Sequence, residues 1–297
     1  MRAGGSLQAG ERRLAAGLLL PGLGAIVLVT AFPLAYTLWE SFHLHDLRMP
    51  WLGRPLVGLA NYAELAGDPR FGEALAHSAF FSTVTVTLEV VLGLVLALAL
   101  DRTFRGRGLT RVAVLLPWAV PSVVAALVWR FMFEGDSSVV NALLGRSLPW
   151  FADARAAWVP LILADVWKTT PFVALLLLAG LQTIDPALHD AARIDGAGAW
   201  RRFREITLPL LVPALGVAML FRALDAFRVF DVVYVLTGGG PGTATEPVSL
   251  YAFNVLFRNL RFGYGAAISM TVFLGAFLIA LAFILLLGPR LVQEAER

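Results

Sequence analysis

The chain has 297 residues, of which 58% are hydrophobic and 15% charged, and its mean hydropathy is +0.74. Soluble domains carry about 25% charged residues, so this composition excludes an ordinary soluble protein and predicts an integral membrane protein. The absence of cysteine excludes disulfides and cysteine-ligated metals, and the four histidines have no metal-binding spacing. The net charge of +3 comes from arginines in short clusters between apolar runs, which indicates membrane topology rather than nucleic-acid binding.

Six apolar stretches are long enough to cross a bilayer, since a spanning helix needs about 20 such residues. They are predicted at about 14–39, 78–100, 111–133, 157–183, 208–235 and 266–288. Helices are expected because they satisfy their own backbone groups within lipid. The first stretch is too long for the apolar core of a signal peptide, so we expect it to be a retained span. It would follow an N-terminal tail, 1–13, and begin a transmembrane domain, 14–288. A second short tail would be 289–297.

The arginines indicate which ends of the spans face the cytoplasm. Thirteen lie in the N-terminal tail, the 101–111 and 184–208 connections and the C-terminal tail, whereas seven lie in the other connections. The positive-inside rule therefore predicts that both termini and the 184–208 connection are cytoplasmic. The longer connections, about 40–77, 134–156 and 236–265, would face outside.

The 184–208 connection has the pattern of two short helices separated by a turn. Pro186 is typical of the first turn of a helix, and Asp195-Gly196 predicts a sharp turn. Trp200, Phe203 and Ile206 then recur every three residues, as on one face of a second helix. Physical reasoning leaves two roles open: an amphipathic linker on the membrane surface, or a docking element for a cytoplasmic partner.

This connection resembles the EAA loop of the permeases of binding-protein-dependent ABC importers, whose pattern is EAAxxDGAxxxxxFxxIxLPxxxP. Here it reads DAARIDGAGAWRRFREITLPLLVP, from Asp190 to Pro213, and departs at Asp190, where the family usually has Glu. The resemblance implies an all-α integral membrane protein of the bacterial cell membrane, with six transmembrane helices in the type I ABC importer permease fold. It also implies that the loop docks on an ATPase through Asp190, Ala191, Ala192, Asp195, Gly196, Ala197, Trp200, Arg201 and Phe203.

Other stretches resemble sugar permeases of the maltose-transporter type, and the MalF-like rather than the MalG-like partner. They are "LLLPGLGAIVLVTAFPLAYTLWESF", "GLANYAELAGDPRFGEAL", "LLPWAVPSVVAALVWRFMF" and "FDVVYVLTGGGPGTATE". Two further stretches, "DVWKTTPFVALLLLAGL" and "FRALDAFRVFDVVYVLTGG", look like trehalose permeases of the mycobacterial type. This implies uptake of a disaccharide such as trehalose, with maltose, oligosaccharides or glycerol-3-phosphate-type solutes as alternatives.

The sequence has no phosphate-binding loop of its own, because its single lysine, Lys168, does not follow the glycine loop that such a site needs. ATP hydrolysis would therefore belong to another chain, and this chain would be a permease rather than an enzyme, with no cofactor of its own. The resemblance implies as partners a second, MalG-like permease, two ATPase subunits that bind ATP and Mg, an extracytoplasmic solute-binding protein, the sugar and membrane lipid, but no nucleic acid.

Several charged residues fall inside the predicted spans, where charge is costly and usually faces the protein interior. They are Glu89, Asp165, Lys168, Arg222, Asp225, Arg228 and Asp231. They either form buried ion pairs that fix helix packing or line a sugar pathway, in which aromatic faces would cover the C–H side of the ring. The residues predicted to line the pathway are Trp118, Trp167, Lys168, Asp225, Phe227, Arg228, Asp231 and Tyr234.

The stretch "TGGGPGT" lacks the following lysine of a phosphate cradle. It is either a flexible outside turn or a loop that touches a docked binding protein or the cavity mouth. The residues expected to contact the binding protein are Gly238, Gly239, Gly240 and Pro241. Two other classes of protein stay open. A membrane enzyme acting on lipid-linked sugars would need a polar constellation such as His43, His45 and Asp46, and a stand-alone secondary transporter would usually have more spans and a repeat.

Overall fold

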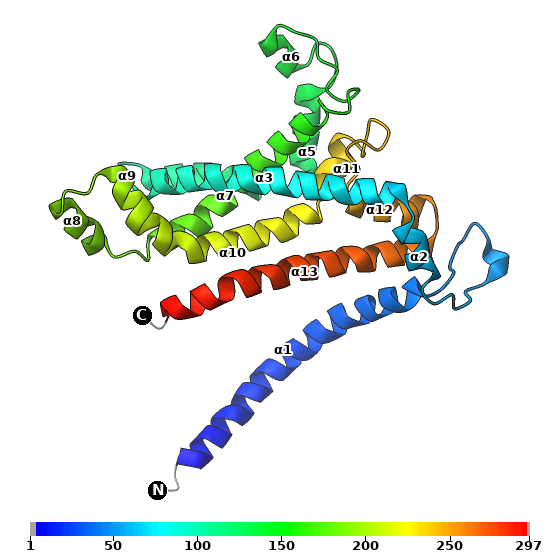
Figure 1. Ribbon diagram of the computed structural model, residues 1–297, viewed down its shortest axis with the longest axis horizontal. Coiled ribbons are helices and arrows are strands. Elements are labelled where there is room, and N and C mark those ends of the chain that lie inside the picture. The colour runs from blue at the N-terminus through cyan, green and yellow to red at the C-terminus, as the bar shows by residue number, and fades with distance from the viewer. Residues whose placement is uncertain (1–3, 296–297) are drawn as a thin grey trace. The chain divides into compact units, whose positions relative to one another are not determined.

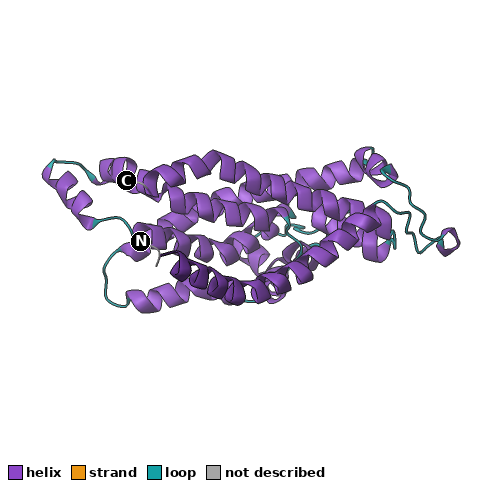
Figure 2. Ribbon diagram, turned by 90° about the horizontal axis from the view of Figure 1, so that it is seen from below, coloured by secondary structure: helices purple, strands orange, loops and turns teal. Residues whose placement is uncertain are grey.

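The computed structural model describes the backbone of residues 4–295 and, apart from Ala16, the side chains of 14–285. The described residues are mostly helical and contain no strand (Figures 1 and 2). The chain divides into two compact units. The first comprises the residues up to Gly67 together with Ala252–Thr271, and the second comprises Asp68–Tyr251 together with the residues from Val272 onward.

The first unit contains α1 (Gly4–Ser41), the 3-10 turn η1 (Pro50–Leu52), α2 (Ala60–Ala66), the π-helical turn η3 (Asn254–Arg258) and the first turns of α13 (Phe262–Ala295). Asn61 ties the end of α1 to α2, because its amide donates to the carbonyls of Ser41 and His43 at 2.8 and 3.0 Å. Asp46 is buried and accepts hydrogen bonds from Arg48, which hold the pKa of the Asp46 carboxyl below its usual value.

The second unit is built on α3, α7 and α10, which pack against one another around a core of alanine, valine, leucine and isoleucine side chains. Its helices are α3 (Pro69–Asp101), α4 (Arg107–Ala119), α5 (Ser122–Phe133), α6 (Val139–Leu144), α7 (Trp158–Leu181), α8 (Pro186–Ile194), α9 (Ala199–Arg202), the π-helical turn η2 (Phe203–Thr207), α10 (Leu208–Phe227), α11 (Asp231–Leu236) and α12 (Val248–Phe253). The boundary of the unit, at Tyr251, falls within α12. Asp68 caps α3 by accepting from the amide of Arg70 at 2.9 Å.

Two glycines allow these three helices to approach closely. A Cβ placed at Gly93 of α3 would lie 2.7 Å from a methyl carbon of Val173 on α7. A Cβ placed at Gly180 of α7 would lie 2.5 Å from that of Ala214 on α10. Small residues at such crossings let backbones pack tightly within a membrane, where no water is expelled to drive helix association.

The third predicted span, 111–133, contains a sharp bend in the structure. Five described helices are long and apolar enough to cross a membrane, and α4 with α5 forms a sixth candidate that is bent by 88°. The bend lies between Pro117 and Pro121. Val120 is extended, with φ −70° and ψ 131°, because the ring of Pro121 disfavours helical geometry in the preceding residue.

The fifth predicted span, 208–235, is also interrupted, since α10 ends at Phe227 and α11 begins at Asp231. No proline or glycine marks this break. The Arg228 amide turns to the carbonyl of Asp225 at 3.2 Å, while the Arg228 Nε donates to the carbonyl of Leu224 at 3.1 Å and so caps the helix end. At the chain ends, α1 and α13 extend into the predicted tails 1–13 and 289–297.

Replacing Gly180 by leucine is expected to lower the free energy of unfolding by about 1–3 kcal/mol, because the new side chain would force α7 and α10 apart. Equilibrium unfolding in mixed micelles would measure this. The matched control is Gly72→Leu, since a Cβ on Gly72 meets no atom within 4 Å. An equal loss in both variants would contradict the close crossing of α7 and α10.

Candidate functional site

A buried arginine joins the three central helices. Arg222 of α10 donates to both carboxylate oxygens of Glu89 on α3, at 2.5 and 2.8 Å, and to Asp165 on α7 at 3.0 Å. Its remaining terminal nitrogen bonds Asp225, one turn along α10. Thr169 adds a hydroxyl that donates to Glu89 at 2.5 Å. Because Glu89 and Arg222 are buried, their charges need opposite partners, and in this network the one guanidinium of Arg222 serves three carboxylates.

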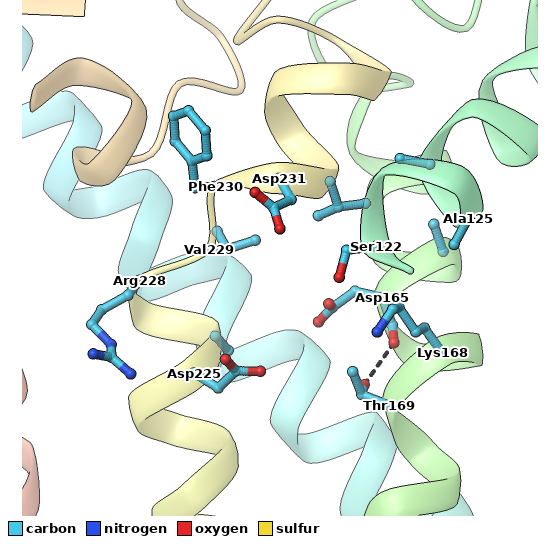
Figure 3. A pocket seen from close by; sticks show the side chains of 14 residues that line it. Ser122, Ala125, Asp165, Lys168, Thr169, Asp225, Arg228, Val229, Phe230 and Asp231 are labelled. Atoms are coloured by element: carbon cyan, nitrogen blue, oxygen red, sulfur yellow. Dashed lines mark hydrogen bonds between the residues drawn. The ribbon is translucent and has the colours of Figure 1, made fainter. Parts of the chain in front are cut away.

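A polar cavity of about 280 Å³ lies beside this network, where α5, α7, α10 and α11 meet (Figure 3). It is open to one side and occupies the place where α10 breaks into α11. Its lining contains three carboxylates, two cations and two hydroxyls as well as apolar groups: Ser122, Ala125, Ala126, Ala164, Asp165, Lys168, Thr169, Asp225, Ala226, Arg228, Val229, Phe230, Asp231 and Val232. Figure 3 shows Ser122, Asp165 and Asp231 turned toward a common space.

Two cations of the cavity have no carboxylate partner in the described part of the chain. Lys168 is half-buried and Arg228 exposed, and neither forms an ion pair there. Asp225 is paired with Arg222, yet 70% of its side chain remains accessible. Such a wall offers hydrogen-bond donors and acceptors to a neutral polyhydroxylated solute. Among the described residues, no group of three side chains is arranged to bind a metal ion.

Four of the eight residues predicted to line the pathway are brought together in this cavity: Lys168, Asp225, Arg228 and Asp231. Tyr234 does not line it but stacks on Phe230, with ring centroids 5.3 Å apart. Phe227 is buried, and its ring would lie 3.0 Å from a Cβ placed at Gly275 of α13.

The two predicted tryptophans also lie outside the cavity lining. Trp118 stacks on Phe172 with centroids 5.7 Å apart, and Trp167 faces a separate apolar groove. Conversely, the prediction omitted Ser122, Thr169 and Phe230. The serine and threonine carried no sequence signal, since single hydroxyls in apolar helices are common, and only their neighbours in the fold distinguish them.

The 184–208 connection forms the helix, turn and helix that its sequence predicts. Asp185 caps α8 by accepting from the amide of Ala187 at 2.9 Å. Gly196 ends this helix with φ +77°, a left-handed conformation that favours glycine. From Ala199 onward, α9, η2 and α10 follow one another without a break and form one apolar helix to Phe227.

The connection presents large apolar side chains to its surroundings. Ile194 is 88% exposed and Trp200 71% exposed, although both are more often buried in folded proteins. Exposed pairs surround them, Asp190 with Arg193 at 2.7 Å and Arg201 with Glu205 at 2.9 Å. Of the predicted docking residues, Ala192, Ala197 and Phe203 are half-buried and the other six exposed. Large exposed apolar side chains beside charged pairs have the character of an interaction surface.

The residues considered for an enzyme site in the first unit are engaged in packing. His43 Nδ1 lies 2.7 Å from the carbonyl of Trp39, and His45 bonds Glu40. The ring of His45 stacks on Phe262, and Asp46 is bound by Arg48. These contacts fix the side chains at this end of α1, while the buried Glu40 Oε2 and His45 Nε2 have no hydrogen-bond partner among the described residues.

Loss of the buried cation is expected to be much more damaging than loss of an exposed one. Arg222→Met leaves Glu89 and Asp165 buried without a counter-charge, so the free energy of unfolding should fall by about 3–5 kcal/mol. Adding Glu89→Gln should recover part of that loss. The control Arg201→Met removes an exposed pair worth less than about 1 kcal/mol. Equal effects at Arg222 and Arg201 would contradict the network, and detergent unfolding curves measure both.

Comparison with known proteins places these features in context. Residues 89–293 match the model of the family described as "Binding-protein-dependent transport system inner membrane component". The trehalose/maltose transport system permease protein MalF of Thermococcus litoralis is 44% identical over 89% of this chain and 90% of its own length. The trehalose transport system permease protein SugA of Mycobacterium tuberculosis is 43% identical, over 94% and 90%.

A third relative differs in the solute that its name gives. The sulfoquinovosyl glycerol transport system permease protein SmoG of Agrobacterium fabrum is 38% identical over 90% of this chain and 88% of its own. Among solved structures, a bacterial ABC transporter that imports alginate superposes with a TM-score of 0.79 at 21% identity, covering 94% of this chain and 96% of that chain. This similarity confirms the predicted permease fold.

Proposed function

Since the chain belongs to the family of inner membrane components of binding-protein-dependent transport systems, we propose that it forms, with a second permease subunit, the pathway for ATP-driven uptake of a disaccharide such as trehalose. The observation that carries this proposal is the polar cavity enclosed by apolar helices. Carboxylates, cations and hydroxyls in a cavity wall form no favourable contacts with lipid chains. They can form hydrogen bonds with the hydroxyls of a sugar in place of water.

The choice of trehalose rests on the relatives. Two relatives that match about nine-tenths of this chain carry trehalose in their names. The permease named for sulfoquinovosyl glycerol is slightly less similar, and its solute is also a polyhydroxylated glycoside. Maltose, oligosaccharides and glycerol-3-phosphate-type solutes are the alternatives, of which the mixed charges of the cavity favour the neutral ones.

Energy would come from two partner ATPase subunits that bind ATP and Mg, because this chain has no phosphate-binding loop. The docking site for an ATPase is proposed at the 184–208 connection, through the exposed surface around Asp190, Ile194 and Trp200. The support for this role is the exposure of Ile194 and Trp200 and the connection's direct continuation into α10, which carries Arg222 and Asp225. A displacement at the docked end would therefore reach the cavity through one helix.

The orientation follows from this arrangement and from the arginine distribution. Both termini and the 184–208 connection would face the cytoplasm, and the glycine-rich loop near Gly238 the opposite side, where a solute-binding protein would deliver the sugar. Figure 1 shows α8 and α9 at one end of α3 and α11 toward the other. The distance between these ends is set by α3, whose 33 residues extend about 50 Å, enough to cross a bilayer.

The docking role is tested by Gly196→Val, assayed as ATP-driven uptake of radiolabelled trehalose in proteoliposomes that hold the complete complex. A β-branched residue cannot adopt φ +77° without strain, so the turn should deform and uptake should fall at least about tenfold. Gly198→Val is the matched control, because Gly198 has φ −65° and open space around it. Unchanged uptake in Gly196→Val would show that the connection is only a linker.

The pathway is tested by Asp231→Asn in the same assay, at saturating sugar-loaded binding protein. Loss of a charged hydrogen-bond acceptor costs about 1.5–3 kcal/mol, so the maximal uptake rate should fall roughly tenfold or more. Glu73→Gln is the matched control, an exposed carboxylate on α3 away from the cavity.

The identity of the sugar is tested by offering trehalose and maltose in parallel to wild-type complexes. If neither is taken up by an assembled wild-type complex, the proposed substrate is wrong.

A further inference from the structure

The glycine-rich loop at Thr237–Pro247 is held in one conformation by its own hydrogen bonds. The hydroxyls of Thr237 and Thr245 lie 2.8 Å apart, and the Thr245 hydroxyl donates to the carbonyl of Gly240 at 2.8 Å. Gly239 has φ +89°, and a Cβ there would lie 3.2 Å from that of Glu246. Thr245 and Glu246 are buried although they belong to a loop. The alternative of a flexible turn is therefore disfavoured.

The loop is also fastened to the first turns of α3. Arg70 donates from Nε and Nη2 to the two carboxylate oxygens of Glu246, at 2.8 and 2.9 Å. His77 Nδ1 lies 3.2 Å from the carbonyl of Glu246, and the Ser78 hydroxyl accepts from the amide of Val248 at 2.9 Å. Paired bonds of this kind fix direction as well as distance.

Arg70 is itself positioned by neighbouring groups. Its guanidinium lies over the ring of Tyr251, 5.1 Å from the ring centroid, and the Tyr251 hydroxyl bonds Asp68, which caps α3. Glu246 is only 3% exposed, whereas 43% of the Arg70 side chain is accessible. The pair therefore connects the buried base of the loop to the accessible end of a transmembrane helix.

We propose that Arg70 and Glu246 are positioning residues that hold the exposed part of this loop, around Gly238 and Gly242, ready for the solute-binding protein. This rests on the proposed function, because it places the loop on the side opposite the ATPase. A loop fixed before contact loses little conformational entropy on binding, which favours a productive encounter. Gly238 and Gly242 are exposed and carry no side chain, so the partner's surface can approach the loop closely at these two positions.

The test uses Arg70→Ala in the complete complex in nanodiscs, with its cognate solute-binding protein loaded with trehalose. A nitroxide attached at Thr243→Cys reports the mobility of the loop. We expect an immobilised label in wild type and a mobile one in Arg70→Ala. The binding-protein concentration that gives half-maximal stimulation of ATP hydrolysis should rise at least about tenfold, while hydrolysis without binding protein stays unchanged.

Two further variants separate positioning from general stability. Arg146→Ala removes an exposed arginine of the same predicted side and should change neither readout. Arg70→Lys keeps the charge but forms one bond where arginine forms two, and should restore both readouts in part. It also serves as the test variant if Arg70→Ala does not assemble.

The outcomes that overturn the proposal are distinct. An immobile label in the Arg70 variants would show that the pair does not position the loop. A mobile label with unchanged half-maximal stimulation would show that the loop does not meet the binding protein. A wild-type complex that no sugar-loaded binding protein stimulates would overturn the proposed function, and this role with it.

Discussion

A single cation within apolar helices constrains the rest of the second unit. Arg222 cannot remain at membrane depth without counter-charges, and α10 itself supplies only Asp225. The other two carboxylates come from α3 and α7, so satisfying one guanidinium fixes the spacing and rotation of three helices. The network also determines which of its polar groups are accessible in the cavity. Because Asp165 and Asp225 extend from the buried arginine to the cavity wall, one charge cluster both holds the bundle together and makes the cavity hydrophilic.

Local sequence patterns predicted the local structure well. The proline at the start of α8, the Asp-Gly turn and the three-residue spacing of Trp200, Phe203 and Ile206 are signals within a few residues of one another. The helix, turn and helix formed as expected. The spacing of Arg222 and Asp225 likewise predicts a pair on one helix face, which is present. The partners Glu89 and Asp165 are 133 and 57 residues away from Arg222. Nothing in a single sequence selects them from the other intramembrane carboxylates.

The failures have physical causes as well. The span at 208–235 has no proline or glycine at its break, yet the Arg228 side chain binds the Leu224 carbonyl that would have continued the helix, a competition that composition does not reveal. Trp118 and Trp167 were selected because they lie near charges in the sequence, but Trp118 belongs to α4, which contributes no residue to the cavity, and Trp167 of α7 faces the apolar groove instead. The glycine-rich loop shows a third cause. Glycines suggest mobility, whereas here they permit tight backbone paths that hydrogen bonds then hold in place.

The continuity of α9, η2 and α10 makes this segment a lever. From Trp200 to Asp225 the helix is about 38 Å long at 1.5 Å per residue, and the only irregular turn in it is the π-helical stretch next to the exposed end. A tilt of about 10° around one end would carry the other roughly 6–7 Å, more than the length of the hydrogen bonds that hold Arg222. A small rotation of the exposed end of this helix would therefore be enough to break and rearrange the hydrogen bonds around Arg222.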